Sequence, residues 1–163
     1  MNGKLMVAGV GNIFMGDDAF GVEVVQQLAR MPLPGNVEVR DFGIRAYDLA
    51  YALMEDWDLA ILVDALPLGD EPGTLYTFEP DLPTNGETGA TVDAHSMNPA
   101  GVLQLVNALG GKFGRVLVVG CEPEVVQTDD EGRIGLSAPV AAAVNGAIEM
   151  ILELIGKNKA AAA

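Results

Sequence analysis

The sequence predicts a three-layer α/β/α domain, in which helices flank a mostly parallel twisted sheet. Strand-like and helix-like segments alternate along the chain, which is typical of a parallel sheet with crossover helices. The strand-like segments near residues 5, 59 and 115 are almost wholly apolar, as strands covered on both faces are. Half of the 163 residues are hydrophobic, which is enough to bury the core of one domain.

The first half of the chain supplies four strands and two helices. The helices are predicted by apolar residues at helical spacing on one face, and the strands by short apolar runs. The fourth strand is more polar than the others, which favours a place at an edge of the sheet. In order, we expect a strand at Leu5–Val10, a helix at Ala19–Arg30, a strand at Val37–Asp41, a helix at Ala46–Glu55, and strands at 59–66 and 73–80.

The second half begins with a polar loop and ends with a long helix. A proline in the first turn marks the start of one helix, and Ser137 is a candidate cap for the last one. We expect a single domain over residues 1–157 and a disordered tail at 158–163. The expected elements are a loop at Pro80–Asp93, a helix at Pro99–Leu109, a buried strand within 115–123, a turn at 128–135 and a helix at Ala138–Ile155.

Charge and composition make several classes of function unfavourable. Nine basic and 23 acidic residues give a net charge of −14, which disfavours binding to nucleic acids and to anionic membranes. The same charge favours a basic or metal-carrying partner. A single cysteine excludes an intrachain disulfide and fits the reducing cytoplasm. Asn145, Glu149 and Glu153 interrupt the last apolar helix, so we expect no membrane span. No heptad pattern indicates an oligomer, and a monomer is expected.

In an open α/β sheet, ligands bind beyond the carboxyl ends of the strands. The chemically active side chains of this sequence follow those ends or could be brought to them by the loop before the third helix. They are Asp17 and Asp18 after the first strand, Asp64 at the end of the third, Cys121 and Glu122 after the fifth, and Asp93 and His95 before the helix at Pro99.

The segment "GVGNIFMGDDAFG" (residues 9–21) follows the first strand but departs from a nucleotide-binding loop. A dinucleotide fingerprint needs a glycine where Phe14 stands, and no lysine follows the glycines as in a P-loop. Asp41 has the place of a ribose-binding acid, yet Asp17 and Asp18 would repel a pyrophosphate at the helix N-terminus. The glycines then serve to turn the backbone and present two aspartates. Asp17 is a candidate helix N-cap and Asp18 a free carboxylate; alternatively, both only stabilise the helix start.

Asp64 and His95 add to this pattern. Asp64 ends the apolar strand "AILVDAL", where a charge is costly unless it is paired or bound to metal. His95 is the one histidine of the chain, and its place before a helix favours the neutral ring that metal binding requires. With Asp18, these residues form an O/O/N ligand set suited to zinc or nickel. A Cys121–His95 nucleophile pair is disfavoured, because Glu122 raises the pKa of the thiol. An Asp18–Asp64 dyad sharing a proton stays open.

The segments "GVGNIFMGDDAFG", "ILVDA", "DAHSMNP" and "VVGCEPE", in this order, resemble the [NiFe]-hydrogenase maturation proteases over about Leu5 to Ile155. The resemblance implies a phosphorylase/hydrolase-like α/β fold and an endopeptidase that trims the C-terminal extension of a hydrogenase large-subunit precursor after nickel insertion. It also implies that Asp18, Asp64 and His95 are the catalytic and metal-binding residues. Nickel would come with the substrate, although zinc or another divalent ion would also suit these ligands.

The mechanism of cleavage stays open between metal-activated water and aspartates acting as bases. Some relatives have glutamate where this chain has Asp18, so the metal position could shift or Asp17 could take over. We expect Asn12 to hold the turn by hydrogen bonds. Arg45 is either a contact for an acidic part of the precursor or a surface residue near a helix start. The alternatives to a protease are a nickel-dependent assembly chaperone that does not cut, and a dinucleotide-binding domain.

Overall fold

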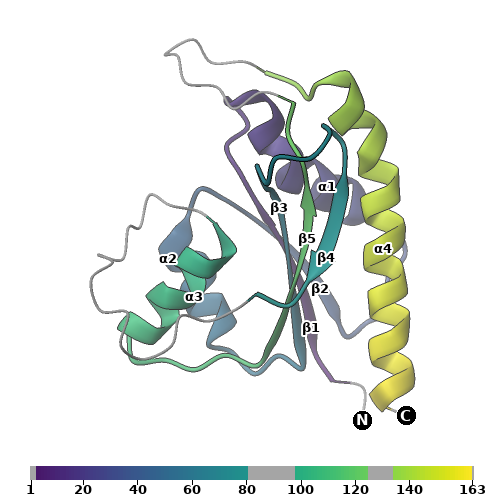
Figure 1. Ribbon diagram of the computed structural model, residues 1–163. Coiled ribbons are helices and arrows are strands. Elements are labelled where there is room, and N and C mark those ends of the chain that lie inside the picture. Colours follow the sequence, from purple (N-terminus) through teal and green to yellow (C-terminus); the bar gives the residue numbers. More distant parts are fainter. Residues whose placement is uncertain (1–2, 81–97, 125–133, 163) are drawn as a thin grey trace.

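The computed structural model describes residues 3–80, 98–124 and 134–162, and within them five strands form one sheet (Figure 1). The strand order is β2-β1-β3-β5-β4, with β4 antiparallel to β5 and every other pair parallel. The mostly parallel sheet is confirmed, and the polar fourth strand lies at an edge as predicted. The strands are β1 (Leu5–Val10), β2 (Val37–Gly43), β3 (Leu59–Ala65), β4 (Leu75–Phe78) and β5 (Arg115–Cys121).

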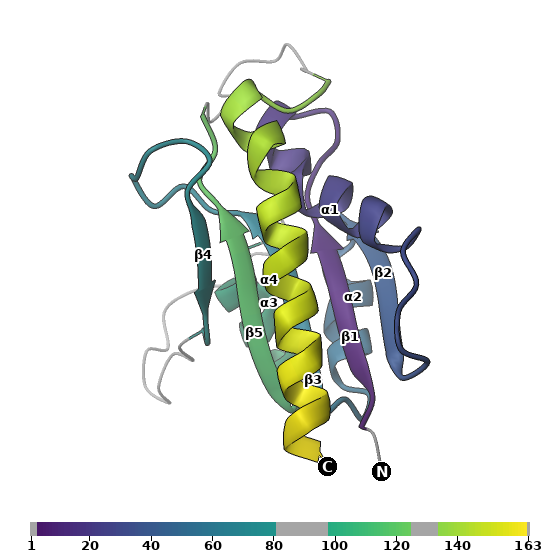
Figure 2. The same cartoon turned by 90° about the vertical axis from the view of Figure 1, so that its right-hand side faces the viewer.

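Helices cover both faces of the sheet, which confirms the three layers (Figures 1 and 2). α1 and α4 lie on one face, and α2 and α3 pack together on the other. A short 3-10 helix, η1, joins the loop after β1 to α1. The helices are η1 (Gly16–Ala19), α1 (Phe20–Leu28), α2 (Ala46–Leu53), α3 (Pro99–Ala108) and α4 (Ala138–Ala162).

The alternation of side chains along the central strands builds two separate hydrophobic clusters. In β1, Leu5 and Val7 join the cluster under α1 and α4, whereas Met6 and Ala8 join the cluster under α2 and α3. All six residues of β1 and the first six of β3 are buried. The continuous apolar runs are therefore explained by the helices on both faces.

The helix α4 is longer than predicted. It runs to Ala162 rather than ending at Ile155, and so enters the segment 158–163 for which the sequence predicts disorder. Alanine and lysine, which dominate its last residues, are strong helix formers. The division into one domain at 1–157 and a tail remains a prediction. The predicted loop 80–93 and most of the predicted turn 128–135 lie outside the described residues.

By length and composition, Ala138–Asn158 of α4 is apolar enough to cross a membrane, contrary to the expectation from the sequence. In the structure, its apolar residues form a stripe that packs against the sheet and α1; Val140, Val144, Ile148 and Ile151 are buried there. The stripe over the sheet accounts for part of the apolar character of α4, since 33% of its apolar window is buried (Figure 2).

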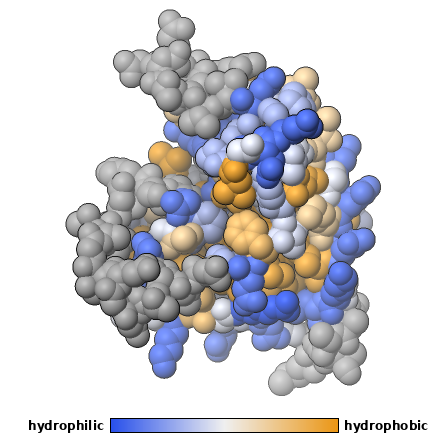
Figure 3. All heavy atoms as spheres, in the orientation of Figure 1, coloured by the Kyte–Doolittle hydropathy of each residue, from blue (hydrophilic) through white to orange (hydrophobic). Residues whose placement is uncertain are grey.

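The fold has two functionally different ends. The carboxyl ends of the four parallel strands meet at the upper end in Figure 1, where the loop to η1 lies. β1 begins and α4 ends at the opposite, lower end. On the face shown in Figure 3, hydrophobic side chains gather toward the centre, and hydrophilic ones lie along the right and lower margins. The upper end is where ligands bind in sheets of this kind.

Candidate active site

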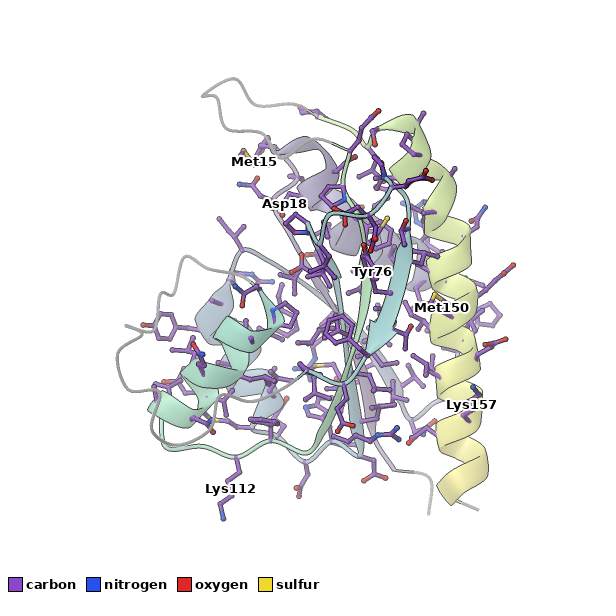
Figure 4. The ribbon with its side chains drawn as sticks, in the orientation of Figure 1. Met15, Asp18, Tyr76, Lys112, Met150 and Lys157 are labelled. Carbon is purple, nitrogen blue, oxygen red and sulfur yellow. The ribbon has the colours of Figure 1, made fainter. Side chains whose placement is uncertain are left out.

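The loop after β1 folds back so that Asp18 lies over Gly11. A Cβ atom on Gly11 would lie 1.9 Å from the carbonyl oxygen of Asp18, and φ of this residue is +147°, so the position requires glycine. The N–H of Asn12 donates to Oδ2 of Asp18 at 2.8 Å, and the Asn12 side chain accepts from the N–H of Phe14 at 2.9 Å. The predicted role of Asn12 is confirmed. Asp18 and Met15 lie together at the upper end of the molecule in Figure 4.

Gly21 brings α1 against the ends of two strands. A Cβ atom on this residue would lie 2.0 Å from the carbonyl oxygen of Val63 and 2.4 Å from that of Val10. Only a helix without a side chain at this point can approach the backbone of β1 and β3 so closely. As a result, η1 and its Asp18 lie next to the end of β3, which carries Asp64.

The carboxyl group of Asp64 is almost fully buried, with 5% of the residue exposed. Burial raises its pKa well above the usual range, and the negative charge of Asp18 raises it further; the N–H of Ala65, which donates to Oδ1 at 2.9 Å, acts in the opposite direction. Within the described residues, this N–H is the hydrogen-bond donor to Asp64. The prediction that an acidic side chain lies beside the core at the end of this strand is confirmed.

Asp18 lies at the surface, yet partial burial of its carboxyl group raises its pKa, while the N–H of Asn12 lowers it. η1, which carries Asp18, contacts β3, which carries Asp64, and the negative charge of Asp18 contributes to the raised pKa of Asp64. Such a pair can share a proton or hold one cation between them. Two of the three predicted site residues are therefore brought to the same end of the sheet.

His95 lies outside the described residues, so its place beside the two aspartates stays a prediction. The helix that it precedes begins where the sequence indicates. Asn98 is the N-cap of α3 and accepts from the N–H of Gly101 at 2.6 Å, and Pro99 is the first helical residue. In the described part of the chain, no group of three metal-binding side chains occurs.

Asp17 has a different role from the one predicted. Its side chain caps neither η1 nor α1; it accepts hydrogen bonds from the N–H of Glu124 at 2.8 Å, and from the N–H and hydroxyl of Ser137 at 2.7 and 2.8 Å. With 4% exposed and three donors, this carboxylate is committed to joining η1 to the end of β5 and the start of α4. The sequence interpretation of Asp17 as an N-cap was wrong, because its partners lie 107 and 120 residues away.

Glu122, like Asp17, is a buried carboxylate whose hydrogen-bond partners could not be predicted from the sequence. Its Oε1 accepts from the N–H groups of Leu68 and Asp70, at 2.9 and 3.0 Å, and from the hydroxyl of Tyr76 at 2.7 Å. Burial alone would raise the pKa of Glu122, but these donors outweigh it and lower the pKa. Glu122 thus fixes the chain that follows β3, only a few residues after Asp64. The sequence feature that could have indicated this role is the position of a glutamate directly after a buried strand.

Cys121 is fully buried, as expected for a small residue at a strand end. Burial raises the pKa of its thiol to about 11, and the carboxylates of Asp17 and Glu122 add to this effect. A thiol with this pKa is not a nucleophile at neutral pH, so the disfavoured Cys121–His95 pair gains no support.

Arg45 is held by its own loop. Its guanidinium donates to the carbonyl oxygens of Asp41 and Phe42, at 2.6 and 3.2 Å, and lies 3.3 Å from the Asp48 carboxylate. Asp41 accepts in turn from the N–H of Gly43 at 2.9 Å. The second of the two interpretations of Arg45, a surface residue near the start of α2, agrees with these contacts.

Comparison with known proteins identifies the family to which this chain belongs. A sequence model of the family described as hydrogenase maturation protease matches residues 22–154. The chain belongs to the hydrogenase maturation protease family. A relative from Methanocaldococcus jannaschii, named for the same family, is 40% identical over 154 residues, which cover 94% of this chain and 97% of the relative. The hydrogenase 2 maturation protease of Escherichia coli is 31% identical and is covered to 92% by this chain, of which 95% is matched.

Solved structures agree with the family. The hydrogenase maturating endopeptidase HybD from E. coli superposes with a TM-score of 0.74 at 28% identity, over 94% of this chain and 93% of that structure. This hydrogenase maturation protease is therefore a peptidase with the α/β fold of its relatives. The alternatives of a dinucleotide-binding domain and of a chaperone without peptidase activity are set aside.

Proposed function

We propose that this protease removes the C-terminal extension of a [NiFe]-hydrogenase large-subunit precursor after nickel insertion, and that it recognises the metal through Asp18, Asp64 and His95. Membership of the family supports the reaction and the hydrogenase partner. What supports the metal site is that η1, which carries Asp18, contacts β3, which carries Asp64, at the end of the sheet where ligands bind, and that the charge of Asp18 raises the pKa of Asp64. We further propose a cytoplasmic monomer that binds neither nucleic acid nor membrane.

The two aspartates fit a divalent cation. Asp64 is buried, and both its burial and the charge of Asp18 raise its pKa, so its ionised form is disfavoured unless a partner stabilises it. A cation between the carboxylates would offset both the burial and their repulsion. Carboxylate oxygens with one imidazole suit nickel, zinc and similar ions. Nickel carried by the precursor would meet an incomplete ligand set, so that binding depends on completed metal insertion.

The residues of this chain would contribute to peptide cleavage in one of two ways. When bound, a metal would supply Lewis-acid activation of the peptide carbonyl or of water. Otherwise, Asp18 or Asp64 would take a proton as a general base. In both cases, the N–H groups of Asn12 and Ala65 orient the carboxylates, because each donates to one oxygen and leaves the other for the substrate.

The deciding experiment is incubation with a candidate large-subunit precursor, with and without nickel, followed by intact-mass measurement. Asp18→Asn, Asp64→Asn and His95→Gln should each abolish the shortened product while the far-UV circular dichroism stays unchanged. Asp56→Asn makes the same chemical change at an exposed position between α2 and β3 and should process normally. Complete processing by all three site variants would refute the site, and absence of any product with the unaltered protein would refute the reaction.

A further inference from the structure

Two hollows lie side by side over α1, next to the loop that holds Asp18. The first, of about 370 Å³, lies between the loop after β1 and the segment from Asp41 to Arg45. The second, of about 310 Å³, lies between α1 and the segment from Ile134 to Leu136. Ile13, Val22 and Gln26 line both hollows. We call the continuous depression the α1 trough.

Exposed apolar side chains line this trough. Ile13 is 48% exposed, Phe14 59%, Ile44 62% and Ile134 82%. These residues come from three separate segments, which follow β1, follow β2 and precede α4. Single exposed apolar residues are common on proteins, but a cluster around a hollow is typical of a protein-binding surface. The trough therefore has the character of a site for another polypeptide.

The trough borders the loop that holds Asp18. Asn12 lines it, and the N–H of this same residue donates to Oδ2 of Asp18. Gly11 also lines it and lies directly under the backbone of Asp18. A peptidase must hold the polypeptide beside its reacting groups, and a chain leaving Asp18 over this loop would enter the trough.

Charges at this end of the molecule restrict what can bind. Among the basic residues whose side chains the structure describes, Arg45 alone follows the carboxyl end of a strand, and its guanidinium is bound to Asp41 and Asp48. Lys112 and Lys157 lie toward the lower end in Figure 4. Asp41 and Glu23 line the trough, so an acidic segment would be repelled. The surface fits a segment with apolar side chains and without acidic ones.

We propose that the α1 trough binds the part of the precursor extension that directly follows the cut bond, through apolar side chains of an extended segment free of acidic residues. The inference rests on the proposed function. In that function, the metal-carrying part of the precursor occupies Asp18 and Asp64, which leaves the trough for the chain that continues beyond the cut. The trough thereby contributes to the choice of precursor, separately from the recognition of metal.

The test compares Ile44→Asp with Tyr51→Asp. Both residues are exposed and apolar, at 62% and 57%, but Tyr51 lies on α2 outside the trough. In steady-state cleavage of a nickel-loaded precursor, Ile44→Asp should raise KM roughly tenfold, the effect of losing one well-placed interface side chain, with little change in kcat. Tyr51→Asp should match the unaltered protein. A synthetic peptide of the extension, followed by fluorescence anisotropy, should lose affinity for Ile44→Asp by a similar factor.

The outcomes separate this inference from the proposed function. If the unaltered protein cleaves and Ile44→Asp cleaves with the same KM, the trough does not bind the extension. If neither cleaves but the peptide binds the unaltered protein and not Ile44→Asp, the proposed reaction fails and the docking surface stands. If Ile44→Asp changes only the sedimentation of the free protein, from dimer to monomer, the trough is a contact between two copies, and the inference is overturned.

Discussion

The carboxylate of Asp17 holds Ser137 by two hydrogen bonds, at 2.7 Å to its N–H and 2.8 Å to its hydroxyl. Ser137 immediately precedes α4, so a negative charge is placed at the positive end of that long helix. The same carboxylate accepts from Glu124 just after β5. One side chain therefore connects three segments, and it is the neighbour in sequence of the proposed metal ligand Asp18.

Asp17→Ala should destabilise the protein by about 2 to 4 kcal/mol, because it leaves the buried N–H and hydroxyl of Ser137 and the partly buried N–H of Glu124 without their charged acceptor. Ser137→Ala removes one of the three hydrogen bonds and should cost only about 1 kcal/mol. Urea unfolding followed by circular dichroism measures both values. Equal losses for the two variants would show that Asp17 does not serve as the shared acceptor.

Gly21→Ala should separate α1 from the strand ends, because its Cβ atom would lie 2.0 Å from the carbonyl oxygen of Val63. We expect a loss of about 1 to 3 kcal/mol in the free energy of unfolding, as for other overpacked positions, together with weaker nickel binding. Gly156→Ala, where an added Cβ atom meets open space on α4, should be neutral or stabilising by up to about 1 kcal/mol. The prediction fails if both variants unfold at the same denaturant concentration.

Asp64→Asn should stabilise the fold at neutral pH, by on the order of 1 kcal/mol. The pKa of Asp64 is raised on folding, so the ionised carboxyl is less favourable in the folded state than in the unfolded one. Its contribution to stability therefore decreases as the pH rises from the ordinary pKa of 3.8 through the raised value. Thermal unfolding at neutral pH should show a higher Tm for this variant than for Asp56→Asn; a lower Tm would contradict the proposed cost of the buried charge.

Glu122 should give the protein an acid-sensitive component of stability. Its pKa is lowered on folding, so its stabilising effect is complete above the ordinary value of 4.5 and is lost as the pH falls through the lowered value. Glu122→Gln should cost about 1 to 3 kcal/mol at neutral pH through poorer acceptance from Leu68, Asp70 and Tyr76. The difference between variant and unaltered protein should shrink on acidification. A difference independent of pH would exclude this role.

The sequence predicts the layers of this fold well, because each depends on local patterns. Leu59–Ala65 is recognisable as a central strand from its unbroken apolar run, and the polar segment at Leu75–Phe78 as an edge strand. Helix ends are less predictable: α1 ends at Leu28 rather than Arg30, and α4 extends past Ile155. Terminal turns gain little from packing, so pattern alone does not fix them.

The candidate site is predicted in part. Asp18 follows β1, and Asp64 lies at the end of the neighbouring strand β3, so the rule for the carboxyl ends of parallel strands is enough to bring them to one end of the sheet. The partners of Asp17 and Glu122 are not predictable in this way, because they come from segments distant in sequence whose approach depends on the complete fold. The α1 trough was likewise not predictable from the sequence, since it is formed by α1 together with separate segments that are distant in sequence.

The opposite placement of the acid pair and the chain ends has a practical consequence. β1 begins and α4 ends at the lower end of the molecule, away from Asp18 (Figures 1 and 4). A purification tag, a fluorescent reporter or a tether to a solid support attached before β1 or after α4 would therefore leave the upper end accessible. Immobilised in that orientation, the protein would offer its acid pair to precursors in solution, which suits binding measurements on a sensor surface.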